Sequence, residues 1–347
     1  MKPITGRRAV FRFDAGPAIG GGHALRCLTL AKSMSRAGWE CWFAINECTQ
    51  SYGKLLSLYK PRCILLSKDA AEEPMDIEYG LGGRGCDLLI VDHYGRDAMF
   101  ETACRNYADR IMVIDDLADR KHDTDLLLDQ NLGRETGDYC DLVSSECRLL
   151  LGPRFALLRP QFLSQRTSAL DRRKGQNHVQ KILISFGMAD PKNLSYTALK
   201  ALFNIRFSGH IDVVIGEYTP SYTMVRLQAQ KMGHKVRILS EVENMAQLMA
   251  NADLAIGGGG ITAWERCAMG LPALSVVYAP NQVLSTRALF NSGAIWMIEG
   301  LSVNQDVIQE KLNEIISDYS TIRHASIRAG QICDAKGCGR VLQSING

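Results

Sequence analysis

Short apolar runs alternate along the chain with longer segments in which apolar residues recur at helical spacing. Because these runs are continuously apolar, each predicts a strand buried on both faces, as in a parallel sheet covered by helices. Helical spacing is clearest in residues 25–38, 98–107, 191–203 and 262–269. The expected strands span residues 9–13, 39–45, 63–66, 87–92, 110–115, 126–128 and 148–151 in the first half, and residues 182–186, 211–215, 236–239, 254–256 and 273–277 in the second.

A polar stretch without apolar periodicity divides this alternation into two halves. We interpret residues 165–178 as a linker between an N-terminal domain of residues 1–164 and a C-terminal domain of residues 179–347. The last helix of the chain is a candidate to return to the N-terminal domain. A chain of 347 residues is long enough for two domains. The predicted fold class is α/β, with two doubly wound Rossmann-like domains whose strand ends face a cleft.

Composition narrows the class of protein. With 46% hydrophobic and 22% charged residues, the chain is typical of globular proteins. Its net charge of +3 comes without a basic tract, so a nucleic-acid partner is not indicated. No apolar run approaches the roughly 20 residues that cross a membrane, and Arg12 and Asp14 interrupt any N-terminal secretory segment. We therefore expect a cytoplasmic protein that acts on a small molecule, and its oligomeric state stays open.

Cysteine and histidine spacing argues against a metal site. None of the eleven cysteines forms a Cys-x-x-Cys pair, and several, such as Cys27, Cys63 and Cys267, fall within apolar segments. In a cytosolic protein such residues are expected to be reduced, mostly buried thiols. Because the histidines and cysteines lack the spacing of zinc ligands, we predict neither a metal nor another cofactor.

Candidate chemistry concentrates at two glycine-rich segments, each between a predicted strand and a predicted helix. The second segment, residues 257–260, is a run of four glycines. Without Cβ atoms, the backbone N–H groups at such a helix start are accessible, and the helix dipole favours an anion such as a diphosphate. The alternative is a plain tight turn, which needs only one or two glycines. The residues expected to hold the anion are Gly259, Gly260, Ile261 and Thr262.

Glu265 lies one helical turn beyond Ile261, on the same face of the predicted helix. At that separation its carboxylate does not crowd the phosphates, and it can accept hydrogen bonds from the two hydroxyl groups of a ribose. Glu265 therefore favours a nucleoside diphosphate as the ligand. A solvated glutamate on a helix surface is the alternative.

The first glycine-rich segment, residues 14–23, carries His23 at the start of the following helix. The segment is not a dinucleotide-binding fingerprint, because Leu25 stands where a third glycine belongs and no acidic residue ends the next strand. It is not a P-loop either, since no Gly-Lys-Ser or Gly-Lys-Thr follows. His23 alone is compatible with a helix cap, a packed core histidine or a catalytic residue.

Polar residues gather with His23 at the predicted strand ends. In parallel α/β sheets, ligands bind at the carboxyl ends of the strands. Each of these residues is able by itself to cap a loop, but their shared edge favours a functional site. They are Asp14, His23, Asp92, His93, Tyr94, Asp115 and Asp116.

Motifs spread in order over most of the chain carry a resemblance to a known family. They are RFDA at 12–15, G-x-G-H at 20–23, RC at 26–27, VD-x-Y at 91–94, DDLA at 115–118, DQN at 129–131, GPRFALLRP at 152–160, GGG-x-T-x-WE at 258–265 and NQ at 281–282. Together they resemble the UDP-sugar hydrolases of bacterial pseudaminic acid biosynthesis. This family has a glycosyltransferase-B fold, like the glucosaminyltransferase that forms lipid II.

The resemblance implies a substrate, a reaction and a set of site residues. The implied substrate is UDP-2,4-diacetamido-2,4,6-trideoxy-β-L-altropyranose, which is cleaved to UDP and the free sugar without a metal and with inversion. His23 is implied as the general base, with Asp14, Tyr94 and Asn281 as supporting catalytic residues that face the cleft. Asp14 either orients His23 or caps its own loop. The implied substrate- and UDP-binding residues are Gly20, Gly22, Gly259, Gly260, Ile261, Thr262, Glu265 and Gln282.

The implied chemistry suits these residue types. Attacking water must lose a proton, and an imidazole kept neutral by a helix N-terminus can take it near neutral pH. The leaving UDP needs charge stabilisation more than protonation, which amides at residues 259–262 can provide. Fold alone leaves open a glycosyltransferase that uses a UDP-sugar donor, a hydrolase of a related UDP-diacetamido sugar, and a catalytically silent binding module.

Overall fold

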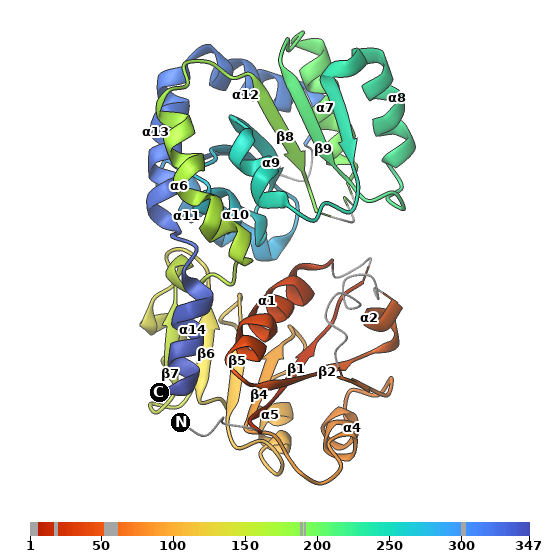
Figure 1. Ribbon diagram of the computed structural model, residues 1–347, viewed down its shortest axis with the longest axis vertical. Coiled ribbons are helices and arrows are strands. Elements are labelled where there is room, and N and C mark those ends of the chain that lie inside the picture. The colour runs from red at the N-terminus through yellow and green to blue at the C-terminus, as the bar shows by residue number, and fades with distance from the viewer. Residues whose placement is uncertain (1–5, 17–19, 52–61, 188–189, 191, 300–302) are drawn as a thin grey trace. The chain divides into compact units, whose positions relative to one another are not determined.

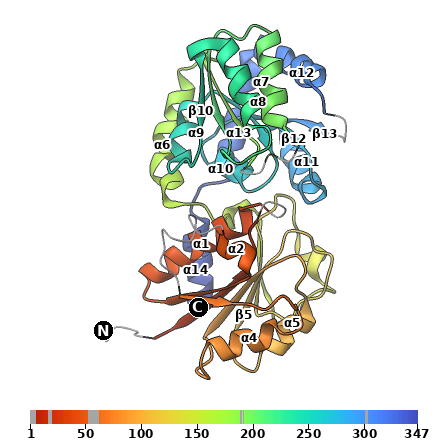
Figure 2. The same cartoon turned by 90° about the vertical axis from the view of Figure 1, so that its right-hand side faces the viewer.

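The computed structural model describes residues 6–16, 20–51, 62–187, 190, 192–299 and 303–347. The chain divides into two compact units, each built around one parallel sheet, as Figure 1 and Figure 2 show. The first unit comprises Met1–Leu157 and Lys336–Gly347, and the second comprises Leu158–Ala335. The predicted α/β class with two doubly wound sheets is confirmed.

The sheet of the first unit has seven strands in the order β3-β2-β1-β4-β5-β6-β7, and every neighbouring pair is parallel. Its elements are β1 (Arg8–Phe13), α1 (Gly22–Arg36), β2 (Glu40–Ile45), α2 (Glu47–Ser51), β3 (Arg62–Leu65), α4 (Glu73–Gly80), β4 (Leu88–Asp92), α5 (Ala98–Cys104), β5 (Ile111–Ile114), β6 (Leu126–Asp129), η1 (Thr136–Tyr139), β7 (Arg148–Leu151), η2 (Pro153–Phe155) and α14 (Gly337–Asn346).

Helices cover both faces of this sheet, because successive residues of a strand point to opposite faces. Phe11 and Phe13 of β1 and Ile90 of β4 belong to a core layer shared with α1 and α14. Val10 and Val91, which point the other way, belong to a layer shared with α4 and α5. The last helix of the chain, α14, therefore packs against α1 in the first unit.

The sheet of the second unit has six strands in the order β10-β9-β8-β11-β12-β13, again all parallel. Its elements are α6 (Pro160–Lys174), β8 (Lys181–Ser185), α7 (Leu194–Asn204), β9 (His210–Val214), α8 (Tyr222–Met232), η3 (Gly233–Lys235), β10 (Val236–Leu239), α9 (Met245–Asn251), β11 (Leu254–Gly258), α10 (Thr262–Ala268), β12 (Ala273–Val277), η4 (Pro280–Gln282), α11 (Val283–Asn291), β13 (Ile295–Glu299), α12 (Gln305–Ser317) and α13 (Tyr319–Ile332).

The second sheet is also covered on both faces. Ile184 of β8 and Ile256 of β11 pack in one core with residues of α7, α8 and α12. Leu183 and Ala255 point to the other face and are buried there, where α6 packs with α9, α10 and α13. Continuous burial of these strands explains why they are apolar throughout. Residue 191, at which the sequence pattern begins the first helix of this half, lies outside the described residues.

The stretch interpreted from sequence as a linker is largely helical. Residues 165–174 lie in α6, which belongs to the second unit. Its buried residues are Phe162, Ala169 and Arg173, and one of these is charged. So sparse an apolar stripe gives no helical period in the sequence, although it packs the helix against α9. The boundary between the units accordingly falls after Leu157, and the linker interpretation was wrong.

The two glycine-rich segments occupy comparable places in the two sheets. Strand order reverses between β1 and β4 in the first sheet and between β8 and β11 in the second. Ligands of open α/β sheets bind outside the carboxyl ends of the strands at such reversals. The first segment follows β1, and the second includes the end of β11. Each segment therefore lies where its own sheet favours a ligand.

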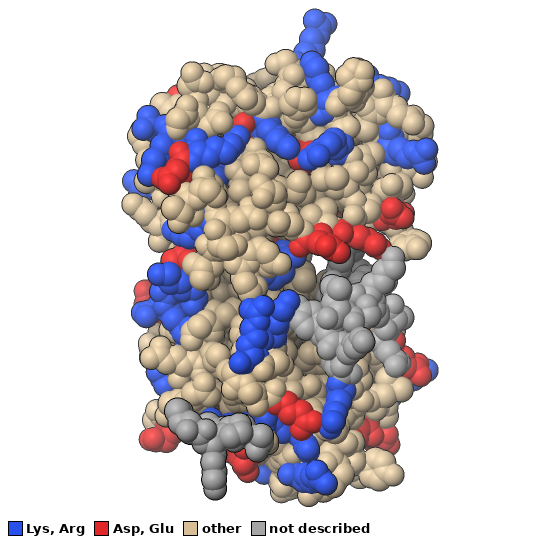
Figure 3. All heavy atoms as spheres, in the orientation of Figure 1, with Lys and Arg blue, Asp and Glu red and all other residues tan. Residues whose placement is uncertain are grey.

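Charged side chains of both signs are spread over the face shown in Figure 3. Within the described part of the chain, no helix has the length and apolar character that a membrane span requires. All eleven cysteines are free thiols, but Cys63 is exposed because it lies on the edge strand β3. Fewer cysteines are buried than we expected, namely Cys27, Cys86, Cys104, Cys267 and Cys333.

Candidate functional site

The first glycine-rich segment delivers His23 at the N-terminus of α1. The helix begins at Gly22, so His23 is its second residue. Gly16 and Gly20 exchange two backbone hydrogen bonds of 3.2 and 2.7 Å, which close the loop between β1 and α1. Gly20 has φ +83°, a conformation that strains any other residue, and no atom of the described residues lies within 4 Å of its Cβ position or that of Gly22. The glycines thus shape the loop and leave room beside it.

Asp92, the last residue of β4, is the carboxylate partner of His23. The two buried side chains meet at 2.5 Å between His23 Nδ1 and Asp92 Oδ1. Asp92 points toward α1 because strand residues alternate, and Leu88 and Ile90 on the same face pack in the core layer shared with α1. Burial would raise the pKa of Asp92, but Arg26 and His23 hold it well below its usual range. An ionised Asp92 requires the hydrogen on Nδ1, so a neutral His23 presents Nε2 as its proton acceptor.

Arg26 holds Asp92 from the other side. Its Nε and Nη2 atoms each lie 2.6 Å from an oxygen of Asp92, and its Nη1 atom donates to Asp116 at 2.9 Å. Arg26 Nη2 also lies 3.3 Å from His23 Nδ1, a contact between two donors that is no hydrogen bond. Because a buried carboxylate needs a compensating charge, Arg26 keeps Asp92 ionised while His23 is neutral.

Tyr94 completes what we call the His23 cluster: His23, Arg26, Asp92, Tyr94 and Asp116. The Tyr94 ring packs edge-on against the His23 ring with centroids 4.7 Å apart. Its hydroxyl donates to Asp116 at 3.2 Å, so the phenolic oxygen acts toward any further partner as an acceptor. The cluster therefore links two of the predicted catalytic residues, His23 and Tyr94, through one continuous chain of charged contacts.

Asp14 belongs to a different set of contacts. Its carboxylate accepts a 2.6 Å hydrogen bond from Arg12 and lies 2.9 Å from His93 Nε2. Arg12 in turn binds a buried glutamate of α4. The interpretation that Asp14 orients His23 was therefore wrong, and Asp92 does so instead. Asp14 follows β1 and Asp92 ends β4 at the same edge of the sheet, and the sequence does not show which of the two His23 will contact.

The second glycine-rich segment is tighter than the sequence suggested. Gly257 and Gly258 are the last residues of β11, not part of a turn. Cβ atoms at Gly257, Gly258 and Gly259 would all be blocked by neighbouring atoms, whereas Gly260 has nothing described within 4 Å of its Cβ position. The blocking residues are, in the same order, Ser185, Tyr278 and Thr286. Close packing thus explains three of the four glycines, and Gly260 is the one whose Cβ position has no neighbour among the described residues.

The backbone N–H groups at the start of α10 differ in whether they donate a hydrogen bond within the protein. Gly259 N–H donates to Gln282 Oε1 at 3.4 Å, so Gln282 supports the segment itself. Among the hydrogen bonds of the described residues, none uses the amides of Gly260, Ile261 or Thr262. Three neighbouring donors at a helix start are therefore available to an acceptor from outside the protein.

Glu265 is not a solvated surface residue, which removes the alternative interpretation. It is 6% exposed, and Arg159, the residue before α6, donates to its Oε1 at 3.1 Å. Burial raises the pKa of Glu265, and Arg159 offsets part of that rise. The contact to Arg159 orients the carboxylate through one of its two oxygens.

The predicted site residues fall into two groups, one in each unit. Asn281 is an exposed residue of η4 and belongs with the second group. The first group contains Asp14, Gly20, Gly22, His23 and Tyr94, and the second contains Gly259, Gly260, Ile261, Thr262, Glu265, Asn281 and Gln282.

Sequence reasoning missed the roles of Asp92 and Arg26 as partners of His23, and of Arg159 as the partner of Glu265. Asp92 ends an apolar strand, and Arg26 follows His23 by three residues, so each carried a local signal. The pairing of residues 159 and 265 spans 106 positions and left no such signal.

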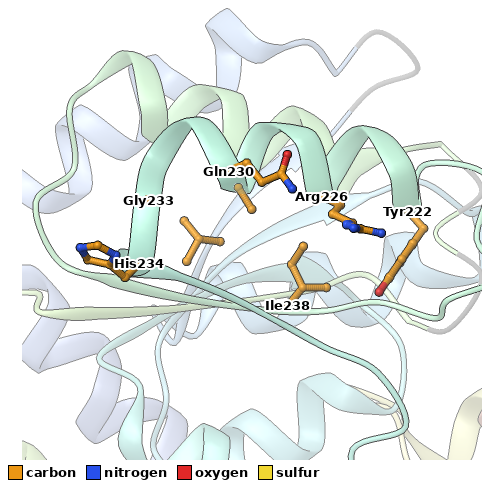
Figure 4. A pocket seen from close by; sticks show the side chains of 8 residues that line it. Tyr222, Arg226, Gln230, Gly233, His234 and Ile238 are labelled. Atoms are coloured by element: carbon orange, nitrogen blue, oxygen red, sulfur yellow. The ribbon is translucent and has the colours of Figure 1, made fainter.

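A hollow elsewhere in the second unit holds none of these residues. It runs along α8 and the edge strand β10, as Figure 4 shows, and is lined by Tyr222, Arg226, Ala229, Gln230, Gly233, His234, Val236 and Ile238. Across the described ranges, no three His, Cys, Asp or Glu side chains gather as a metal site.

Comparison with known proteins defines the class. Residues 182–332 match the glycosyltransferase family 28 C-terminal domain. The crystal structure of Acinetobacter baumannii MurG covers 98% of this chain and 99% of its own, with a TM-score of 0.70 at 15% identity. The chain thus has the glycosyltransferase-B fold, and part of its second unit is similar to the family 28 C-terminal domain.

Curated relatives are more specific. The UDP-2,4-diacetamido-2,4,6-trideoxy-β-L-altropyranose hydrolase of Campylobacter jejuni is 24% identical over 287 residues, which are 82% of this chain and 97% of that protein. The spore coat polysaccharide biosynthesis protein SpsG of Bacillus subtilis is 24% identical over 94% of both chains. An uncharacterized protein of Methanocaldococcus jannaschii is 26% identical over 75% of this chain, and the match spans 54% of that relative. The resemblance found in the motifs is confirmed as a similarity along most of the chain.

Proposed function

We propose that this protein hydrolyses UDP-2,4-diacetamido-2,4,6-trideoxy-β-L-altropyranose to UDP and the free sugar, with inversion, in pseudaminic acid biosynthesis. The similarity to the Campylobacter jejuni hydrolase supports the substrate. The observation that carries the reaction type is the buried contact between His23 Nδ1 and Asp92. This contact leaves Nε2 of a neutral imidazole as a proton acceptor, which is what attack by water requires.

In the proposed reaction, His23 Nε2 takes a proton from water as the water oxygen bonds to the anomeric carbon. The bond from that carbon to the UDP oxygen breaks, and its electron pair leaves with UDP. Asp92 stabilises the imidazolium that forms, and Arg26 keeps Asp92 ionised before the proton arrives. Attack opposite the departing UDP inverts the anomeric carbon.

The supporting residues have distinct proposed roles. Tyr94 accepts a hydrogen bond from the water or from a sugar N–H group, because its own hydrogen is directed to Asp116. Asn281 is exposed and offers both a donor and an acceptor to an acetamido group. Asp14 holds His93 and Arg12, so we assign it to support of the loop after β1.

We assign UDP to the second unit. The free amides of Gly260, Ile261 and Thr262 suit the diphosphate. Glu265, oriented by Arg159, suits the two ribose hydroxyls. Gln282 and Gly259 shape the segment through their mutual hydrogen bond. In the first unit, the open Cβ positions of Gly20 and Gly22 leave space for the sugar beside His23.

The test is to incubate the purified protein with the UDP-sugar in the absence of any acceptor. The proposal expects UDP release, an inverted free sugar by NMR, and the same rate in EDTA, because the sequence lacks ligand spacing for a metal. Loss of turnover in EDTA with recovery in magnesium would contradict the metal-free part of the proposal.

A glycosyltransferase is the second candidate, favoured by the family 28 match of residues 182–332. It predicts UDP release only when an acceptor is present. A silent binding module predicts UDP binding with no release under either condition. Faster release from another UDP-diacetamido sugar would keep the hydrolase and change its substrate.

A further inference from the structure

Arg266 is a buried cation at the second glycine-rich segment that the proposed reaction does not yet use. It is 3% exposed. Its Nη2 atom donates to the carbonyl of Gly258 at 2.7 Å and lies 3.3 Å from Ser275 Oγ. Its Nη1 atom lies 3.5 Å from Thr262 Oγ1. All of these acceptors are neutral, although transferring a guanidinium from water to such a place is costly.

The other buried arginines have different partners. Arg12 and Arg26 each contact two carboxylates. Arg173 contacts no carboxylate, but it donates to two carbonyls at the C-terminal end of α9, where the helix dipole is negative. Arg266 has neither kind of partner among the described residues. Its position is therefore unusual within this chain.

Neighbouring charges leave an excess of positive charge at this segment. The carboxylate of Glu265 acts on Arg266 through space, but it is hydrogen-bonded to Arg159. Two guanidinium groups thus share one carboxylate. Burial lowers the pKa of Arg266, as it lowers the pKa of Arg173.

The guanidinium lies against the end of β11 and reaches the side chain of Thr262, the first residue of α10. Arg266 Nη1 is 3.0 Å from the Cβ position of Gly257, and the carbonyl of Gly258 is bound by Nη2. Two buried polar atoms here, Arg266 Nε and Thr286 Oγ1, have no hydrogen-bond partner within the described chain. Arg173 Nε is likewise unsatisfied, so what sets Arg266 apart is its contact with Thr262, whose amide no hydrogen bond of the described residues uses.

We propose that Arg266 supplies the positive charge that binds the diphosphate of the nucleotide and stabilises UDP as it leaves. This inference rests on the assignment of UDP to the second unit. As the anomeric bond breaks, its electron pair passes to the β-phosphate, and negative charge grows there. A cation fixed in a buried position stabilises that charge without reorganising. The anion, in turn, compensates the charge that the folded protein leaves unpaired.

Three variants separate charge from structure in calorimetric titrations with UDP and with uridine. Arg266→Gln keeps a donor for the carbonyl of Gly258 but removes the charge, and Arg266→Lys keeps the charge. Arg173→Gln is the matched control, because Arg173 is also buried and has no carboxylate contact within the described part of the chain. Circular dichroism checks that each variant is folded.

Arg266→Gln is expected to weaken UDP binding by about tenfold to thirtyfold while leaving uridine binding unchanged. A loss of this size corresponds to the attraction between two unit charges about 8–10 Å apart at an effective dielectric constant of about 20. Arg266→Lys should keep the ratio of UDP affinity to uridine affinity within about threefold of the wild-type value. Arg173→Gln should not change this ratio.

Equal losses for UDP and uridine would show a structural role and overturn the proposal, as would unchanged UDP binding in Arg266→Gln. If Arg266→Gln does not fold, Arg266→Lys tests the proposal alone. Because lysine keeps the positive charge, a fall of about tenfold in the ratio of UDP affinity to uridine affinity would contradict a role of that charge. A wild-type protein that binds no UDP overturns both this inference and the proposed function. Binding without hydrolysis overturns only the proposed reaction.

Discussion

Arg26 and Arg266 are each the fifth residue of a helix that follows a glycine-rich segment, yet their surroundings are opposite. Arg26 is held between the carboxylates of Asp92 and Asp116, so its charge is compensated without a ligand. Arg266 meets only neutral acceptors. The first arrangement fixes a proton acceptor in one orientation, and the second leaves a charge for an anion to complete. The comparison suggests that the two units divide proton transfer from nucleotide binding.

The largest effect on turnover is expected from a substitution of Asp92, the carboxylate that contacts His23. Asp92→Asn should lower kcat for UDP release by about 10²- to 10⁴-fold, because an amide neither fixes the tautomer of His23 nor stabilises its imidazolium. Asp14→Asn is the matched control and should lower kcat by less than about tenfold, since Asp14 contacts His93 and Arg12 instead. Similar losses in both variants, measured on folded protein, would contradict the assignment of Asp92.

On the nucleotide side, the largest effect is expected at Glu265. Glu265→Ala should weaken UDP binding by about 1–3 kcal/mol, the usual loss for hydrogen bonds to a charged group. Glu310→Ala removes an exposed glutamate of α12 in the same unit and should leave binding unchanged. Calorimetry measures both, and wild-type UDP affinity in Glu265→Ala would remove the ribose assignment.

The pH dependence of uridine binding tests whether Arg159 acts through Glu265. Burial raises the pKa of Glu265 and Arg159 lowers it, so Arg159→Gln should raise that pKa further. A protonated Glu265 is the weaker acceptor, so uridine affinity should fall on acidification by about threefold to tenfold. In Arg159→Gln this fall should begin at higher pH than in the wild type. Uridine is the probe because it carries no titrating phosphate, and identical pH profiles would show that Arg159 does not act through Glu265.

A smaller effect is expected where Tyr94 closes the His23 cluster. Tyr94→Phe keeps the ring against His23 but removes the hydroxyl on Asp116, and kcat should fall by about threefold to tenfold. Tyr139→Phe is the control, because Tyr139 is a buried tyrosine bound to Asp115 and Asp129. It should lower the thermal midpoint of unfolding and leave kcat unchanged. The reverse pattern would place Tyr94 outside the chemistry.

The sequence predicted the fold well because the strands are apolar throughout. The strands 148–151, 236–239 and 273–277 have the predicted bounds. It did not reveal β13 (Ile295–Glu299), and it placed a linker where α6 forms. Both errors have one cause, because an apolar pattern in the sequence reports burial. Helix α6 buries few apolar residues, and β13 buries its residues unevenly.

The sequence also located His23 and the second glycine-rich segment, but not their partners. Choosing between Asp14 and Asp92 required the order of strands in the sheet, which spacing along the chain does not encode. Three of the four glycines that suggested a phosphate site are required by packing against Ser185, Tyr278 and Thr286. Contacts between residues distant in sequence, such as Arg159 with Glu265, lie beyond local patterns.

The most direct test of the division between proton transfer and nucleotide binding is to measure kcat and UDP affinity on one preparation of His23→Asn. If His23 is the general base, kcat falls by about 10²- to 10⁴-fold, and the acid limb of the wild-type pH–rate profile disappears. UDP affinity stays within about threefold of wild type, because the proposal assigns the nucleotide to the second unit. Near-normal turnover at saturating substrate, together with weakened UDP binding, would contradict this division and make His23 a nucleotide-binding residue.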